Sequence, residues 1–396
     1  MPKFIVCLGD GMADLPIDRF NGKTPLQFAK TPNMDWLAAK GQSGLVHTVP
    51  AGLNPGSDVA NMGILGYDPR LYYTGRGPIE AASMGVPVED NQVIFRCNLV
   101  TLQDGVMADF TAGHITTEEA DAILVSLNAH FEGRGLTFFT GVSYRHILRM
   151  DQRFLDLKTH APHDVTDKAV APYWPSGSTA AELMALVDEA AELLRTHPVN
   201  VGRLSEGKKP VTHIWPWSQG RYPSLPSFKE IWGLTGGIVT AVDLLRGLAT
   251  LTGLESPAVK GATGFLDTNY EAKVQAGLEI LKNNDFLYLH VEAPDECGHM
   301  GDPELKVQAI EDFDREIVGR VLDYVAKHDD VHVLVLPDHP TPCALKTHSH
   351  APVPYALYYS GIEADAVQAY DETSATGSGV EFDTPWDLMR HFLVGL

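Results

Sequence analysis

Carboxylate and imidazole side chains suited to metal binding are concentrated in the last third of this chain, with one further carboxylate near its start. They occur in four short stretches, GDG, DECGH, PDH and THSHAP. The candidate ligands are Asp10, Asp295, His299, Asp338, His339 and His348, with His350 as a further candidate. Carboxylates and imidazoles without a required thiolate suit Mn²⁺, Zn²⁺ or Mg²⁺ rather than Cu(I) or an iron–sulfur cluster. These ligands are too many for one catalytic ion, so we expect two, about 3.5–4 Å apart as in sites of phosphoryl transfer.

A serine, Ser57, is a candidate nucleophile. It lies in NPGSDVANMGILGYDP, residues 54–69, a stretch whose glycines and prolines favour a shaped loop before a helix-compatible run. One interpretation is that Ser57 only caps the helix that follows. The other is that its hydroxyl attacks a substrate, which requires activation by a metal ion or a base.

Three short apolar runs predict the strands that would position these side chains. They are KFIVCL (3–8), FLYLHV (286–291) and VHVLVL (331–336), and each is followed at once by a stretch that contains a carboxylate. Such runs are typical of buried strands in a parallel sheet. Ligands of open α/β sheets bind beyond the carboxyl ends of the strands. We therefore predict an α/β fold with a central, mostly parallel sheet whose carboxyl edge carries the site.

Helical patterns separate the predicted strands. Capping boxes begin at Thr116 and at Thr268, and Gly253 is a plausible C-cap. Apolar periodicity and these caps predict helices over 116–131, 179–196, 237–252, 268–283 and 304–327. Alternating strands and helices are typical of an α/β protein.

The middle of the chain differs from its two ends. Residues 93–210 contain fewer patterns of central strands and include the proline-rich APYWPSGST. A chain of 396 residues fits two domains. We therefore predict a smaller α+β domain inserted at 93–210 between two parts of the sheet domain, 1–92 and 211–396.

Composition limits the partners of this protein. The formal net charge of −21 disfavours nucleic acid and anionic membranes as partners, and an anionic substrate would need local positive charge from metal ions or arginines. The N-terminal residues lack the features of a signal peptide, and no apolar stretch approaches the length of a membrane span. The four cysteines are scattered and form no CxxC pair, so we expect reduced thiols in a cytoplasmic protein. The sequence leaves the oligomeric state open.

Eight motifs in order along nearly the whole chain resemble the archaeal-type cofactor-independent phosphoglycerate mutases of the alkaline phosphatase superfamily. The motifs are GDGMAD (9–14), GSDVANMGILGYDP (56–69), YYTGRGPIEAA (72–82), RCNLVT (96–101), GATGFLDTNY (261–270), DECGH (295–299), PDH (337–339) and HSHAPVP (348–354). The resemblance implies an alkaline-phosphatase-like fold and a glycolytic isomerase that acts on a small phosphorylated substrate. It also implies that Ser57 is the nucleophile that becomes phosphoserine.

The resemblance further implies a division of the ligands between two ions. One ion would be held by Asp10, Ser57, Asp338 and His339, and the other by Asp295, His299 and His348. His348 is favoured over His350 because it matches the family's ligand histidine in HSHAPVP. We expect Mn²⁺, with Zn²⁺, Mg²⁺ and Co²⁺ as the other candidates.

The mechanism implied by the resemblance interconverts 2-phosphoglycerate and 3-phosphoglycerate in two transfers. Ser57 would take the phosphoryl group, glycerate would reorient while bound, and its other hydroxyl would take the group back. The inserted domain would be a lid that holds glycerate and excludes water. The candidates for binding the substrate are Arg76, Arg96, Arg145, Arg149 and Lys260, with Asp109 and His114 as an acid and base toward the glycerate hydroxyls.

One segment departs from the family pattern and leaves an alternative open. HIWPWSQGRYP (213–223) stands where the compared mutases tend to carry an arginine in a glycine-rich turn. A homoserine kinase-like phosphotransferase would use the same serine and metals with another acceptor pocket. GRLSEGKK (202–209) is close to a phosphate-binding loop, but Lys209 replaces its Ser or Thr and no strand precedes it, so we interpret it as a surface turn. A phosphatase and a non-catalytic, metal-stabilised binding protein are the remaining alternatives.

Overall fold

The computed structural model describes residues 2–395, and the chain divides into two compact units. The first unit comprises Met1–Tyr73 and Ser224–Leu396, and the second comprises Thr74–Pro223. The range 93–210, predicted for an inserted domain, lies within the second unit, which begins earlier and ends later. The earlier start includes helix α5 (Arg76–Ser83), which packs against strand β3 (Gln92–Gln103) of the same unit.

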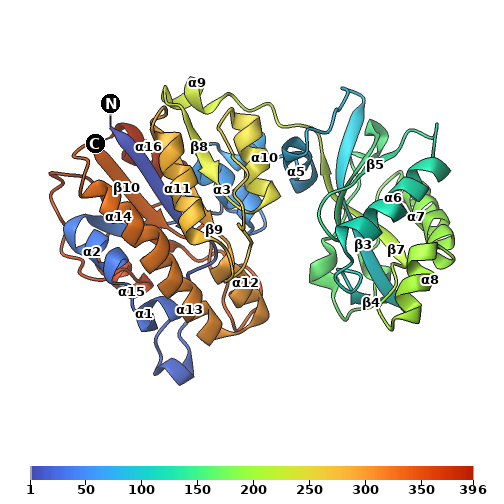
Figure 1. Ribbon diagram of the computed structural model, residues 1–396, viewed down its shortest axis with the longest axis horizontal. Helices are drawn as coiled ribbons and strands as arrows, with labels where there is room; N and C mark the ends of the chain where they lie inside the picture. The colour runs from blue at the N-terminus through green and yellow to red at the C-terminus, as the bar shows by residue number, and fades with distance from the viewer. Residues whose placement is uncertain (1, 396) are drawn as a thin grey trace. The chain divides into compact units, whose positions relative to one another are not determined.

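The first unit is built on a seven-stranded sheet with the order β12-β2-β11-β10-β1-β9-β8 (Figure 1). Its strands are β1 (Lys3–Gly9), β2 (Gln42–Val46), β8 (Gly236–Val239), β9 (Phe286–Val291), β10 (Val331–Leu336), β11 (Val353–Tyr358) and β12 (Glu381–Phe382). The neighbours β10, β1, β9 and β8 are parallel, whereas β11 runs antiparallel to both β10 and β2. The three predicted strands and the largely parallel sheet are confirmed.

The register of the three central strands brings their carboxyl ends to one edge of the sheet. Leu8 of β1 pairs with Leu336 of β10, and Gly9 pairs with Val291 of β9. The residues that follow these strands therefore start from the same edge, as the sequence predicted.

Helices cover both faces of this sheet. They are α1 (Pro25–Phe28), α2 (Pro32–Lys40), α3 (Ser57–Ile64), α4 (Pro69–Tyr72), α9 (Phe228–Trp232), α10 (Asp243–Thr252), α11 (Tyr270–Leu281), α12 (Ala293–Met300), α13 (Pro303–Phe313), α14 (Gly319–Val325), α15 (Glu372–Gly377) and α16 (Pro385–Val394). Ile5 and Cys7 of β1 share one buried apolar core with residues of α2, α11, α13 and α14. Phe4 points to the other face, where its ring packs edge-on against Phe392 of α16. Figure 1 shows α11, α13 and α14 on one side of the strands.

Three helix predictions in the first unit need correction. The range 237–252 begins in strand β8 rather than in a helix, because a short apolar run does not distinguish the two; its end before Gly253 is confirmed. The N-cap of α11 is Asn269, because the hydroxyl of Thr268 accepts a hydrogen bond from Thr263 in the preceding loop. The range 304–327 is interrupted by the π-helical segment Asp314–Val318. That segment directs the Asp314 carboxylate to the backbone N–H groups at the start of α2.

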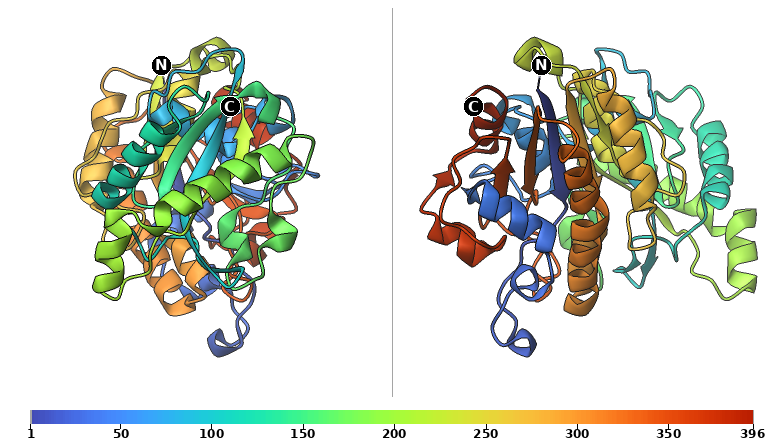
Figure 2. Two further views of the ribbon diagram at one scale, coloured as in Figure 1. Left: turned by 90° about the vertical axis from the view of Figure 1, so that its right-hand side faces the viewer. Right: turned by 60° about the vertical axis from the view of Figure 1, so that its left-hand side comes forward.

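The second unit contains an antiparallel sheet of five strands with helices packed on it. The strands are β3, β4 (Val106–Asp109), β5 (Thr137–Phe139), β6 (Arg145–Asp151) and β7 (His213–Gly220). The helices are α5, α6 (Thr117–His130), α7 (Ala180–Arg195) and α8 (Pro198–Ser205). Helices α6 and α7, both predicted, share one apolar core with β3 and β6, and the left view of Figure 2 shows green helices across this sheet.

None of the helices in residues 2–395 is long and apolar enough to cross a membrane. Cys7, Cys97, Cys297 and Cys343 are all buried and form no disulfide.

Candidate active site

Loops and one helix at the carboxyl edge of the first unit's sheet hold the predicted ligands. Asp10 directly follows β1, and its backbone N–H donates to the carbonyl of Val291 at the end of β9. Asp338 and His339 follow β10. Helix α12 begins two residues after β9, so Asp295 and His299 lie one turn apart on the same helical face.

The first ligand group contains Asp10, Asp338 and His339, all fully buried. His339 Nε2 lies 3.7 Å from Asp10 Oδ1 and 3.3 Å from Asp338 Oδ2. Ser57 faces this group: its Oγ lies 3.1 Å from His339 Nε2 and 3.5 Å from Asp10 Oδ2. The serine hydroxyl is therefore next to three residues that are ordinary metal ligands.

The second ligand group contains Asp295, His299 and His348. His299 Nε2 lies 3.2 Å from Asp295 Oδ2, His348 Nε2 lies 3.4 Å from Asp295 Oδ1, and the two Nε2 atoms are 3.0 Å apart. His350, the further candidate, is exposed and belongs to neither group.

The hydrogen bonds of the second group determine which imidazole nitrogens carry protons. His299 Nδ1 is 3.0 Å from the carbonyl oxygen of Lys346, and His348 Nδ1 is 3.2 Å from that of Pro55. A carbonyl only accepts, so both Nδ1 atoms carry hydrogen and donate it. In the neutral rings, two Nε2 lone pairs then face each other 3.0 Å apart, an arrangement that a cation between them stabilises.

The electrostatics of the site also fit bound cations. Burial and the adjacent Asp338 carboxylate raise the pKa of Asp10 well above its usual range, and Asp10 Oδ1 is buried without a hydrogen-bond donor. Burial lowers the pKa of His339 to about 4. Burial also disfavours the charged form of His299, but the hydrogen bond and charge of Asp295 outweigh it and raise its pKa to about 9. The metal-free ring therefore holds a proton that a bound cation would displace. Divalent cations would satisfy the orphaned oxygen and offset the buried negative charge.

The position of Ser57 excludes the capping interpretation. The N-cap of α3 is Gly56, no side chain caps this helix, and Ser57 is its first helical residue. Its hydroxyl is thus not used by the helix and points instead to His339 and Asp10. The amino end of a helix also favours a negatively charged group, such as phosphate, at this position.

Several residues that sequence reasoning did not assign support the site. Asn61 donates from Nδ2 to Ser57 O and to Asp338 Oδ2, both at 2.9 Å. His290 Nε2 lies 2.9 Å from Asp10 Oδ2, and its Nδ1 lies 3.1 Å from Thr240 Oγ1. The only sequence signal for His290 is an imidazole inside an otherwise apolar strand.

Lys306 joins the loops that follow β1 and β10. Its fully buried ammonium donates to Ala13 O at 3.1 Å, to Asp14 Oδ2 at 2.8 Å and to Thr341 O at 2.8 Å. These loops carry Asp10 on one side and Asp338 and His339 on the other. A lysine on the buried face of a helix was the signal that could have revealed this role.

Two proteins with similar sequences have the same name. A 2,3-bisphosphoglycerate-independent phosphoglycerate mutase of Methanosarcina barkeri is 48% identical over 376 residues, which cover 94% of each chain. One of Methanothrix thermoacetophila is also 48% identical and covers 99% of this chain and 100% of its own. The profile of the 2,3-bisphosphoglycerate-independent phosphoglycerate mutase family matches residues 38–200. The chain belongs to this family.

Solved structures agree with the family assignment. The PH0037 protein of Pyrococcus horikoshii is 31% identical and superposes with a TM-score of 0.81, covering 99% of this chain and 97% of its own. The cofactor-independent phosphoglycerate mutase of Thermoplasma acidophilum is 28% identical, with a TM-score of 0.63 and 99% coverage of both chains. The α/β architecture described above is thus shared with a solved cofactor-independent phosphoglycerate mutase.

Three of the predicted substrate-binding arginines of this mutase-family chain gather around Glu80 in the second unit. Arg76 Nε donates to Glu80 Oε1 at 2.7 Å, and Arg96, itself 3% exposed, forms an ion pair with the same oxygen. Burial would raise the pKa of Glu80, but the charges of Arg96, Arg76 and Arg145 hold it below its usual range. Three guanidinium groups against one carboxylate leave an excess of positive charge, which suits an anion.

The other predicted substrate residues make different contacts. Arg149 donates to the carbonyl of Pro87 at 2.6 Å. Asp109 accepts from Thr111 and from Lys209, and His114 is exposed with a φ of 49°. Lys260 is exposed in the loop between α10 and α11 of the first unit.

The segment that departs from the family pattern is part of strand β7. Trp215 and Trp217 are buried, and the guanidinium of Arg96 lies 5.2 Å from the centre of the Trp217 ring. Half of GRLSEGKK belongs to helix α8, and the rest is a turn and loop that follow it. No strand precedes this segment directly, because α7 and α8 stand before it, so it is not a phosphate-binding loop.

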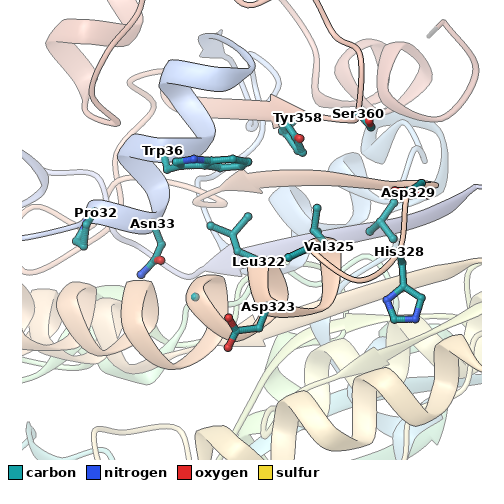
Figure 3. Close-up of a pocket in the computed structure, with 13 residues that line it drawn as sticks. Pro32, Asn33, Trp36, Leu322, Asp323, Val325, His328, Asp329, Tyr358 and Ser360 are labelled. Atoms are coloured by element: carbon teal, nitrogen blue, oxygen red, sulfur yellow. The ribbon is translucent and has the colours of Figure 1, made fainter.

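A cavity of about 490 Å³ in the first unit lies elsewhere, among Trp36, Leu322, Tyr358 and their neighbours (Figure 3). None of the predicted site residues lines it. Val331, at the amino end of β10, is part of its wall, whereas Asp338 follows the carboxyl end of that strand. The cavity is therefore at the end of the sheet away from the ligand groups.

Proposed function

We propose that this protein is a cofactor-independent phosphoglycerate mutase that interconverts 2-phosphoglycerate and 3-phosphoglycerate through a phosphoserine at Ser57. The observation that carries the proposal is the position of Ser57 Oγ, 3.1 Å from His339 Nε2, beside Asp10 and at the amino end of α3. Membership of the family supports the choice of substrate.

Two divalent ions fit the two ligand groups. We assign one ion to Asp10, Ser57, Asp338 and His339, and the other to Asp295, His299 and His348, with Mn²⁺ as the preferred metal. When bound, such ions withdraw negative charge from the phosphoryl oxygens and from the serine oxygen. The orphaned Asp10 oxygen and the facing imidazole nitrogens support this assignment.

Ser57 performs both transfers. Its Oγ attacks the phosphorus of the substrate, the bond to the departing glycerate oxygen breaks, and phosphoserine forms. Asp10 and His339 both face the hydroxyl. Over the whole transfer its proton passes to the departing glycerate oxygen, which leaves as a hydroxyl, and the second transfer returns a glycerate hydroxyl proton to Ser57. Asn61 fixes the first turn of α3 against Asp338, so that the attacking oxygen keeps its place. The amino end of the helix stabilises the phosphoserine until the other glycerate hydroxyl attacks it.

The second unit supplies positive charge for an anionic substrate. Arg76 and Arg145 are the best candidates for the substrate carboxylate, because Arg96 is buried in its ion pair with Glu80. Arg96, Arg149, Lys260, Asp109 and His114 stay predictions. We also propose that this unit acts as the lid that excludes water, and that the protein is cytoplasmic, in keeping with its four free thiols.

A coupled assay with Mn²⁺-loaded protein and 3-phosphoglycerate, without nucleotide or bisphosphoglycerate, tests the proposal. We expect 2-phosphoglycerate to form, the activity to disappear on chelation, and the Ser57→Ala variant to be inactive. Intact-mass measurement of the quenched wild-type reaction should reveal one added phosphoryl group that the variant lacks. Absence of turnover together with ATP-dependent phosphorylation of homoserine would refute the mutase and favour the kinase alternative.

A further inference from the structure

Thr341 lies between the two ligand groups. Its Oγ1 is 2.5 Å from Asp295 Oδ1 and 3.2 Å from His339 Nδ1, and the residue is fully buried. Asp295 belongs to the second group and His339 to the first. A single hydroxyl therefore contacts one ligand residue of each group.

The chemistry of these partners fixes the direction of both hydrogen bonds. The ionised Asp295 carboxylate only accepts, so Thr341 must donate its one proton to Asp295. The hydroxyl oxygen then offers only lone pairs to His339, whose Nδ1 must carry hydrogen and donate it. This leaves the His339 Nε2 lone pair facing Ser57 and the carboxylates of the first group.

Backbone and side-chain contacts hold Thr341 in this position. Its N–H donates to Ala13 O at 3.1 Å, and its carbonyl accepts from Lys306 at 2.8 Å. A Cβ at Gly11 would lie 2.6 Å from Thr341 Oγ1, and one at Gly298 would lie 2.4 Å from Thr341 O. The loop after β1 and helix α12 thus carry glycine where the threonine needs space.

We propose that Thr341 is a positioning residue for both metal-ligand groups, because it orients the Asp295 carboxylate and keeps the His339 Nε2 lone pair available. The inference rests on the proposed metal dependence. Removing a contact that orients a metal ligand typically lowers metal affinity about 10–100-fold. Because Thr341 contacts both groups, the loss should affect both binding events rather than one.

Calorimetric titration of metal-free protein with Mn²⁺ tests this role without measuring turnover. The Thr341→Val variant keeps the shape of the side chain and loses the hydroxyl, whereas Thr341→Ser keeps the hydroxyl. Thr252→Val is the matched control: this buried threonine of α10 donates to the carbonyl of Leu248 and takes no part in the site. We expect about 10–100-fold weaker binding in both steps for Thr341→Val and at most about 3-fold for Thr341→Ser. The control should bind like wild type.

Each contrary result has a distinct meaning. Wild-type affinity in a folded Thr341→Val variant, or equal losses in the Val and Ser variants, would overturn the role of Thr341. Failure of the wild-type protein to bind metal would instead refute the proposed function. If Thr341→Val does not fold, Thr341→Ala replaces it: Thr341→Ser must then bind at least about 10-fold more tightly than Thr341→Ala, and a smaller difference overturns the inference.

Discussion

Replacing Lys306 by methionine should destabilise the first unit, because Lys306 neutralises a buried carboxylate. In the native protein its ammonium donates to Asp14 and to the carbonyls of Ala13 and Thr341. Methionine has a similar length but no donor, so the substitution leaves the three acceptors without this partner. Asp14, only 7% exposed, keeps hydrogen bonds from the N–H groups of Leu15 and Cys343 but loses its cation.

The size of the effect follows from this burial. Removal of one partner from a buried ion pair costs about 3–5 kcal/mol of unfolding free energy. For a unit of this size that corresponds to a fall in Tm of about 6–20 °C. A second substitution, Asp14→Asn, should recover at least about 1 kcal/mol in the Lys306→Met background, because it removes the unpaired charge.

Urea unfolding and thermal melting followed by circular dichroism measure these differences. Lys282→Met is the matched control, since the Lys282 side chain is 66% exposed and its ion pair with Glu279 lies on the surface. We expect that control to change stability by no more than about 0.5 kcal/mol. A loss of less than about 1 kcal/mol in Lys306→Met, or no recovery on adding Asp14→Asn, would refute the reasoning.

Three further outcomes are expected. Ser57→Ala should abolish phosphoryl transfer. Its free energy of unfolding should stay within about 1 kcal/mol of the wild-type value, because this hydroxyl caps no helix. Turnover by the variant at the wild-type rate would exclude covalent catalysis by Ser57. Asp338→Asn should remove one of two bound ions per chain and nearly all activity, as checked by metal analysis of the purified variant; two retained ions would exclude Asp338 as a ligand. Burial raises the pKa of Glu372 to about 7, so the folded state favours the protonated side chain. Its contribution to the free energy of unfolding is therefore complete below about pH 4.5 and is lost as the pH rises through 7. As the pH rises from 5 to 8, the free energy of unfolding of Glu372→Gln should therefore increase by about 1–3 kcal/mol relative to that of the wild type. An opposite trend in urea unfolding would contradict this assignment.

The edge of the sheet that carries the site was predictable from local sequence. Each central strand is a short, mostly apolar run, and a carboxylate follows each run within a few residues, so the same stretch predicts both the strand and the ligand. His299 could be predicted as a ligand in the same way, because its spacing from Asp295 is one helical turn. The carboxylate and imidazole ligands alone then indicated divalent metal ions, without knowledge of which residues they contact in the fold.

The supporting residues were not predictable, because their partners are remote in sequence. Asn61 binds Asp338 across 277 residues, and Lys306 binds Asp14 across 292. The asparagine has no local pattern that distinguishes its role from exposure to solvent, and the place of Lys306 on an apolar helix face indicates burial but not its partner. The predicted start of α11 is wrong because two adjacent residues, Thr268 and Asn269, can both cap a helix. The Thr268 hydroxyl accepts a hydrogen bond from the Thr263 N–H in the loop, and Asn269 caps the helix.

The division of the first unit into two chain segments has a consequence for synthesis on the ribosome. Among residues 2–395, the sheet partners of strand β1 are β9 and β10, which follow it by about 280 and 330 residues. The second unit, by contrast, is one continuous segment with its own apolar core. At about 5–20 residues per second, roughly 15–65 s pass before β1 can meet both neighbours. During that interval the second unit can complete its fold, while KFIVCL stays an exposed apolar strand that needs protection. Because Asp338, His339 and His348 follow β10, emergence of this late segment, rather than of the nucleophile, sets the earliest moment at which both ligand groups can assemble.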